Sequence, residues 1–76
     1  MEELIAFIAR SLVDQPDAVR VARTDEDDAV IIELAVAPDD LGKVIGKQGR
    51  TARAMRSLLA ALAAKVNKRS RLEIVE

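Results

Sequence analysis

The chain has 76 residues, enough for one small domain, and we expect a single domain spanning residues 1–76. It contains no Cys and no His, which excludes a disulfide framework and a thiolate metal site and removes the usual general base, so we predict neither an enzyme nor a cofactor. The net charge of −1 hides an asymmetry: residues 1–40 carry 3 basic and 11 acidic side chains (−8), whereas residues 41–76 carry 9 basic and 2 acidic ones (+7), which favours an anionic partner for the second half.

The first predicted element is an amphipathic helix over residues 2–14, which Pro16 ends. Its expected buried stripe consists of Leu4, Ile5, Ile8 and Leu12, with Phe7 and Val13 as further candidates. The apolar run is short and follows Glu2 and Glu3, whereas a secretion signal has a basic start and a longer apolar run. No segment approaches the roughly 20 apolar residues of a membrane span. We therefore expect a cytoplasmic protein that does not bind membranes.

Two strands follow, with an acidic turn between them. Val19 and Val21 flank Arg20 in a short first strand, and residues 29–37 form a longer second strand. Asp25–Asp28 lacks the glycine and the alternating ligand spacing of a calcium loop, so we interpret this segment as a hairpin turn. Alternation in the second strand predicts a buried face and an opposite face, formed by Val30, Ile32, Leu34 and Val36 and by Ile31, Glu33 and Ala35, respectively.

The next segment combines a short helix with a glycine turn. Pro38–Asp40 supplies a turn and the N-cap of a helix over residues 39–45, which Gly46 ends. Gly46 and Gly49 enclose two residues, and both positions can adopt positive φ. The helix that begins near Arg50 directs its unpaired N–H groups and the positive end of its dipole at this turn. The pattern therefore predicts a backbone clamp for phosphate.

Two better-known phosphate loops do not fit these glycines. Gln48 stands where a P-loop has the Ser or Thr that binds magnesium, and no strand leads directly into the turn. The intervals between Gly42, Gly46 and Gly49 also differ from those of the dinucleotide fingerprint. An apolar-Gly-x-x-Gly turn between two helices is instead the loop with which KH domains hold about four nucleotides.

A long, alanine-rich helix is predicted from Arg50 or Thr51 to about Val66. Its expected core positions are Met55, Leu59, Leu62 and Val66, with Ala52 near its start. Asn67 can end the helix in a left-handed conformation. A last strand over residues 70–75 would bury Leu72 and Ile74 on one face.

Residues 44–51, VIGKQGRT, resemble the KH signature, and nearly the whole chain resembles the small bacterial single-KH-domain RNA-binding proteins of the KhpA family. The resemblance implies an α+β fold of the type II, prokaryotic KH kind. In this arrangement the element order is α-β-β-α-α-β, and three helices cover one face of a three-stranded sheet. The resemblance also implies RNA binding in post-transcriptional regulation or RNA chaperoning.

We expect the sugar-phosphate backbone of a single-stranded RNA to lie across the glycine turn. The predicted RNA-binding residues are Lys43, Val44, Ile45, Gly46, Lys47, Gln48, Gly49, Arg50, Arg53 and Arg56. Bases would enter a groove between the short helix and the edge of the strand over residues 29–37, with Leu41, Val44, Ile45 and Ile31 as walls. The only aromatic residue, Phe7, is remote, so we predict weak binding with low sequence specificity. Lys65, Lys68, Arg69 and Arg71 are left out, because cations also favour a helix C-terminus.

The alternative is a protein-interaction or dimerisation module whose RNA contact is secondary. Ala54, Ala60, Ala61 and Ala64 place small side chains on an otherwise exposed face of the long helix, which permits close helix packing. We take Ala54, Ala61 and Ala64 as the possible dimer interface. The family resemblance implies a homodimer, or a heterodimer with a larger, KhpB-like multidomain KH protein. No small-molecule substrate is expected.

Overall fold

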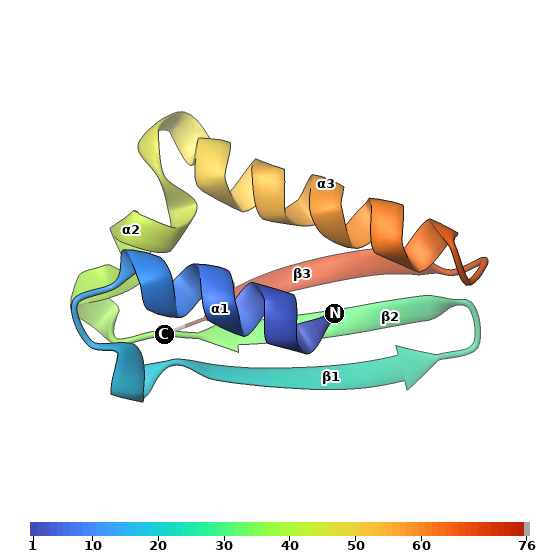
Figure 1. The fold of residues 1–76 in the computed structure, drawn as a ribbon, viewed down its shortest axis with the longest axis horizontal. Coiled ribbons are helices and arrows are strands. Elements are labelled where there is room, and N and C mark those ends of the chain that lie inside the picture. The colour runs from blue at the N-terminus through green and yellow to red at the C-terminus, as the bar shows by residue number, and fades with distance from the viewer. Residues whose placement is uncertain (76) are drawn as a thin grey trace.

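The computed structural model describes residues 1–75 and confirms the predicted α+β order. Helices and strands follow one another along the chain in the order α-β-β-α-α-β (Figure 1). The elements are α1 (Glu2–Leu12), β1 (Arg20–Glu26), β2 (Ala29–Ala35), α2 (Leu41–Ile45), α3 (Arg50–Ala64) and β3 (Arg69–Val75). Short 3₁₀ turns occupy Pro16–Ala18, Pro38–Asp40 and Lys47–Gly49. Within residues 1–75, no helix is long and apolar enough to cross a bilayer.

The three strands form one mixed sheet in the order β1-β2-β3. β1 and β2 are antiparallel, with Arg20 opposite Ala35, and β2 and β3 are parallel, with Ala29 beside Arg69. β2 therefore has a hydrogen-bonded neighbour on each side. The prediction that an edge of this strand forms one side of the groove beside the short helix is wrong, because β1 and β3 occupy both edges along the whole of Ala29–Ala35.

The core lies between the sheet and the helices. The predicted alternation of β2 is confirmed, since its inward-facing residues are fully buried beneath the helices. The largest fully buried apolar side chains are those of Ile5, Val19, Val30, Ile32, Leu34, Val44, Met55 and Leu59. Their burial supplies most of the favourable free energy of folding, at about 25 cal/mol per Å² of apolar surface.

The predicted buried stripe of α1 is only partly right. Ile5 is fully buried, but Phe7 is 69% exposed and Leu12 is 41% exposed. Ala6 and Ala9 occupy the buried face instead, and their small side chains let the helix lie close to the sheet. The helix also ends at Leu12, two residues earlier than predicted.

The long helix, α3, turns its predicted face to the core, except at its end. Ala52, Met55 and Leu59 are buried as predicted, together with Ala63. Val66 is 55% exposed, so its assignment to the core is wrong. The helix stops at Ala64, and the left-handed conformation predicted for Asn67 (φ 60°) then carries the chain toward β3.

Asp40 has a different role from the predicted helix cap. Its side chain makes no capping bond to α2 and is almost fully buried. The carboxylate accepts hydrogen bonds from the backbone N–H groups of Asp14 (3.1 Å) and Gln15 (3.0 Å). It thus joins the end of α1 to the start of α2 and holds in place the helix that precedes the glycine turn.

The acidic hairpin is tighter than predicted. β1 extends through Asp25 to Glu26, so only Asp27 and Asp28 form the turn. Seven consecutive residues of β1 pair with β2, which explains why the strand continues into the acidic segment.

Candidate nucleic-acid interface

The glycine turn between α2 and α3 has a left-handed backbone. Gly46 has φ 77° and ψ 170°, and Gly49 has φ 75° and ψ 13°, so the predicted positive φ values are confirmed. Gln48 also has positive φ (57°). No feature of the sequence indicated that a residue other than glycine would adopt this conformation, because Gln is not enriched there.

Gly46 is glycine for two structural reasons. Its φ/ψ combination belongs to a region that only glycine populates readily. A Cβ at this position would also clash with the Thr51 hydroxyl and lie 2.9 Å from the Thr51 backbone nitrogen. The first turn of α3 therefore packs directly against the backbone of Gly46.

Two amides of the turn have no internal partner. The N–H of Gly46 donates to the carbonyl of Gly42 (2.9 Å), and the N–H of Gly49 donates to the carbonyl of Gly46 (3.0 Å). Within residues 1–75, the amides of Lys47 and Gln48 donate to no backbone or side-chain acceptor. Successive amides exposed in such a turn form a concave site for an anion.

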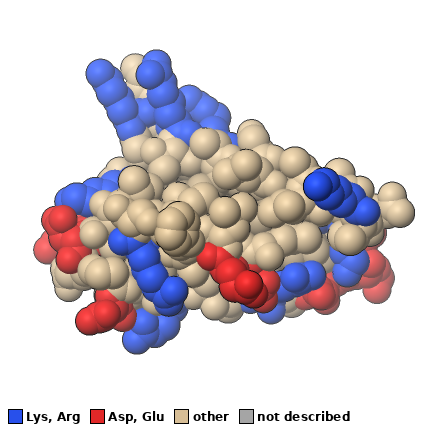
Figure 2. Space-filling model, viewed as in Figure 1, with Lys and Arg blue, Asp and Glu red and all other residues tan. Residues whose placement is uncertain are grey.

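The side chains around the turn add positive charge. Lys47, Arg50 and Arg53 form no ion pair with a carboxylate in the described part of the chain, and all three are exposed. The guanidinium of Arg50 donates to the side-chain oxygen of Gln48 (3.3 Å). Figure 2 shows Lys and Arg side chains projecting from the tip formed by the turn, with no acidic side chain among them on this face. The tip is thus both positive and accessible.

Two predicted RNA-binding cations have internal partners instead. The ammonium of Lys43 lies 3.1 Å from a carboxylate oxygen of Asp14 and 3.8 Å from one of Asp40. The hydrogen bond to Asp14 and its negative charge raise the pKa of Lys43. Arg56 donates to the carbonyl of Leu72 (3.4 Å), which links α3 to β3. These two cations are therefore less available to a ligand than the three at the tip.

The predicted apolar groove is only partly present. Val44 is completely buried and belongs to the core, whereas Ile45 is 37% exposed beside the turn. Ile31 alternates with the inward-facing Val30 and Ile32, so it lies on the sheet face opposite the helices and is not a wall of this groove. Leu41 is half-buried against the core.

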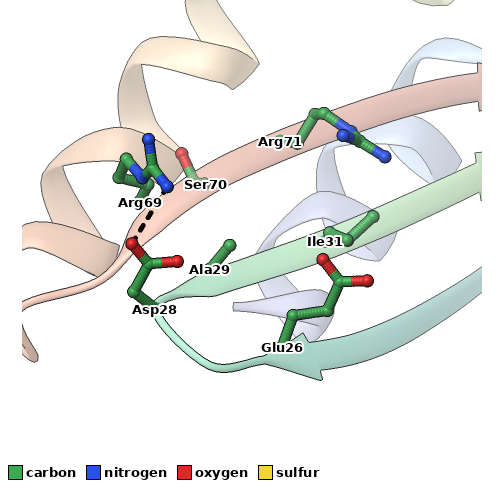
Figure 3. Close-up of a pocket in the computed structure, with 7 residues that line it drawn as sticks. All are labelled: Glu26, Asp28, Ala29, Ile31, Arg69, Ser70 and Arg71. Carbon is green, nitrogen blue, oxygen red and sulfur yellow. Dashed lines mark hydrogen bonds and ion pairs between the residues drawn. The ribbon is translucent and has the colours of Figure 1, made fainter.

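A second hollow lies on that opposite sheet face, near the β1–β2 hairpin (Figure 3). It has a volume of about 310 Å³ and is lined by Glu26, Asp28, Ala29, Ile31, Arg69, Ser70 and Arg71. Arg69 pairs with Asp28 at 2.9 Å, and Arg71 lies 3.8 Å from a carboxylate oxygen of Glu73. Both cations that line this hollow thus lie near a carboxylate.

The predicted dimer residues lie together on one helix. Ala54, Ala61 and Ala64 are all exposed on α3. The segment Ser57–Ala64 carries no charge, and Leu58 within it is 46% exposed.

Among the described residues, no group of three or more acidic, His or Cys side chains could hold a metal ion.

A three-stranded mixed sheet, three helices and a glycine turn between the second and third helix define this chain as a KH domain. The family model described as "KhpA/KhpB, KH domain" matches residues 2–74. The chain therefore belongs to the KhpA/KhpB family of KH domains, which confirms the predicted resemblance.

Similar proteins support the same assignment over the full chain length. The chain is 54% identical over 76 residues to the RNA-binding protein KhpA of Halalkalibacterium halodurans, covering 100% of both chains. It is 52% identical over 75 residues to that of Clostridium acetobutylicum, covering 99% of this chain and 100% of the relative. It is 49% identical over 76 residues to that of Aquifex aeolicus, covering 100% of this chain and 96% of the relative. No solved structure matches the chain.

Proposed function

We propose that this chain binds single-stranded RNA through the glycine turn, with low sequence specificity. The observation that carries the proposal is the pair of unpartnered amides at Lys47 and Gln48, at a tip where three cations lack carboxylate partners. A phosphate placed there would accept hydrogen bonds from the two backbone amides. It would also be attracted by the positive charges of Lys47, Arg50 and Arg53. The similar proteins are named RNA-binding proteins, which supports the same ligand.

The affinity of one domain is expected to be modest. The described structure has no aromatic side chain near the turn, because the only one, Phe7, lies on α1. Stacking, worth roughly 1–3 kcal/mol per base in other single-strand binders, is therefore absent. With three available cations, the slope of log K against log salt should be about −2, at roughly 0.7 per phosphate contact. In the cell, such a protein would act in the cytoplasm, in post-transcriptional regulation or as an RNA chaperone.

A charge reversal at the turn tests the proposal. The double substitution Lys47→Asp with Gln48→Asp should weaken binding of a short, fluorescently labelled RNA at least about tenfold, because one cation is lost and two carboxylates would repel a phosphate at the turn. A matched control, Lys65→Asp with Thr24→Asp, makes the same change in net charge away from the turn. Circular dichroism should show that both variants keep the fold. Equal RNA affinity of the turn variant and the parent chain would refute the proposal.

A second candidate function is self-association, or pairing with a larger KH protein, through α3. The observation that favours it is the outer face of the uncharged segment Ser57–Ala64, where Ala60, Ala61 and Ala64 are exposed and their small side chains permit another helix to approach closely. A dimer would present two turns to one RNA, which raises the apparent affinity through effective concentration.

Sedimentation velocity tests this second candidate. Ala61→Asp should shift a parent dimer to a monomer, because a carboxylate would be buried at the helix contact without a partner. Ala22→Asp on the far sheet face is the control and should leave the dimer intact. A parent chain that sediments as a monomer at every concentration and does not pair with a larger KH protein would rule it out.

A further inference from the structure

The outer edge of β1 carries a run of backbone groups that the sheet does not use. β1 is the first strand of the sheet and, among residues 1–75, pairs with β2 alone (Figure 1). The amide of Val36, just after β2, donates to the carbonyl of Val75, so the even-numbered residues of β2 direct their N–H and C=O groups to β3 and the odd-numbered ones to β1. The antiparallel register then turns the N–H and C=O groups of Val21, Arg23 and Asp25 to the open edge.

This edge lacks the features that commonly close an edge strand, which are proline, a bulge or a covering element. β1 contains neither Pro nor Gly, its seven residues pair with β2 in unbroken register, and six of them are exposed. The residue before the strand shows a closed position, since the carbonyl of Val19 accepts a hydrogen bond from the guanidinium of Arg20 at 2.9 Å. In the described part of the chain, no side chain makes such a bond to the backbone of Val21, Arg23 or Asp25. The edge is therefore available to another strand.

The sequence of β1 is complementary to itself when two copies are placed antiparallel about Arg23. Arg20 lies three residues before Arg23 and Glu26 lies three residues after it, so each Arg20 faces Glu26 of the second copy. Both side chains lie on the open sheet face, at positions of the new pairing where opposite side chains come closest. All three edge residues of each copy are hydrogen-bonded in this register.

The centre of this pairing places Arg23 of one copy opposite Arg23 of the other. Each guanidinium is already paired within its own chain, with Asp25 at 2.8 Å and with Glu2 at 3.5 Å. Two carboxylates from each copy would thus surround the two arginines, and Asp25 of each copy would lie diagonally across from Arg23 of the other. The like charges at the centre are therefore compensated.

We propose that β1 is a self-association edge, on which a second copy of this chain adds its own β1 antiparallel, so that two three-stranded sheets join into one of six strands. The occupant is a second copy because the charges of β1 repeat with the two-fold symmetry that such a contact requires. The contact is small, so we expect a dissociation constant of about 0.1–1 mM. It stays open at the micromolar concentrations at which a contact through α3 is measured.

This edge is separate from the other surfaces of the molecule. α3 packs over β3, at the opposite side of the sheet from β1, so a contact through α3 leaves the β1 edge free. The inference does not depend on RNA binding at the turn, because the turn contributes no residue to it. Copies that are held close together, for example on one RNA, would fill the edge through their high effective concentration.

Charge reversal tests the pairing, by sedimentation equilibrium of the full chain up to about 2 mM. Every protein carries Ala61→Asp, which disrupts a contact through α3. Glu26→Arg should weaken the association at least about tenfold, because it places an arginine opposite Arg20 at both ends of the pairing. Adding Arg20→Glu exchanges the two charges and should restore the association to within about threefold. Glu33→Arg, on the open face of β2, is the matched control and should have no effect.

Amide hydrogen exchange locates the contact within the chain. The N–H groups of Val21, Arg23 and Asp25 should exchange at least about threefold more slowly at about 1 mM than at about 50 µM, because the second strand accepts their hydrogen bonds. Circular dichroism should show that all variants keep the fold.

Three results would overturn the inference. The first is a chain with Ala61→Asp that stays monomeric at about 2 mM. The second is equal association of Glu26→Arg and Glu33→Arg, which would place the contact elsewhere or in a register that does not set Arg20 opposite Glu26. The third is a double charge exchange that associates as weakly as Glu26→Arg alone.

Discussion

The glycine turn and the hairpin end of the sheet both carry cations from the same basic half of the chain. The two regions differ in whether these cations have a carboxylate partner. At the hairpin, Arg69 lies 2.9 Å from the carboxylate of Asp28, which comes from the acidic half (Figure 3). At the turn, Lys47 and Arg53 have no carboxylate partner in the described part of the chain. The fold thus neutralises one group of cations and leaves the other available.

This contrast shows why a count of charges along the sequence does not locate a binding surface. Residues 41–72 contain no carboxylate, so every cation in this stretch looks equally available in the sequence. The parallel pairing of β3 with β2 brings Arg69 beside the acidic hairpin, and the packing of α1 against α2 brings Asp14 beside Lys43. The turn projects away from both contacts.

The two regions also differ in backbone conformation. The hairpin end consists of paired strands, whereas the turn contains three residues with positive φ. Such conformations are unfavourable and persist only where the surrounding structure holds them. In this protein, the support comes from Thr51 beneath Gly46 and from Asp40 at the base of α2.

The largest expected effect comes from a methyl group at the first residue of the turn. Gly46→Ala should destabilise the fold by about 3 kcal/mol or more, because it adds a clash with Thr51 to a backbone conformation that disfavours side chains. Urea unfolding followed by circular dichroism measures this loss. Gly49→Ala is the matched comparison and should cost only about 1–2 kcal/mol, since its Cβ would lie 3.6 Å from the nearest atom, Nη1 of Arg53. Equal stability of Gly46→Ala and the parent would mean that the turn is not held by packing.

A somewhat smaller loss of folding stability is expected when the hydrogen bonds that join the start of α2 to the end of α1 are removed. Asp40→Ala should destabilise the protein by about 2–4 kcal/mol, because it leaves the N–H groups of Asp14 and Gln15 without their acceptor in a partly buried site. Thermal unfolding measures the change. Asp40→Asn keeps one acceptor oxygen and should lose less, whereas Asp39→Ala, at an exposed neighbouring position, should be close to neutral. A neutral Asp40→Ala would contradict the role of this carboxylate as a structural link.

Much of the fold could be predicted from the sequence because its signals are local. Alternation in β2 identified the buried face, and glycine spacing identified the positive φ values of the turn. The predicted left-handed conformation of Asn67 is confirmed for the same reason, and α3 ends two residues before the predicted end near Val66. Local periodicity and turn chemistry act within a few residues, so a single sequence contains them.

The errors concern contacts between distant segments. Asp40 looked like a helix cap because its partners are 25 and 26 residues away in the sequence. Leu12 and Phe7 looked buried because periodicity gives the apolar side of a helix but not its rotation on the sheet, which Ala6 and Ala9 determine. At the candidate site, the same limit hid the partners of Lys43, which became visible only when α1 was placed against α2. The pairing of both β2 edges likewise depends on strand order.

The smallest expected effects come from two substitutions that each remove one cation, one from the turn and one from the hairpin end. They test the comparison between the two regions most directly. Arg53→Gln at the turn should weaken RNA binding about three- to fivefold and reduce the salt slope by about 0.7, since one phosphate contact is lost. Arg69→Gln removes the same charge from a guanidinium that Asp28 already neutralises, so binding should stay within about twofold and the slope should not change. Anisotropy titrations at several salt concentrations, with both variants at matched protein concentration, measure the two effects. If Arg69→Gln reduced affinity and slope as much as Arg53→Gln, RNA would contact the hairpin end as well, and the pairing of cations with carboxylates would not decide where RNA binds.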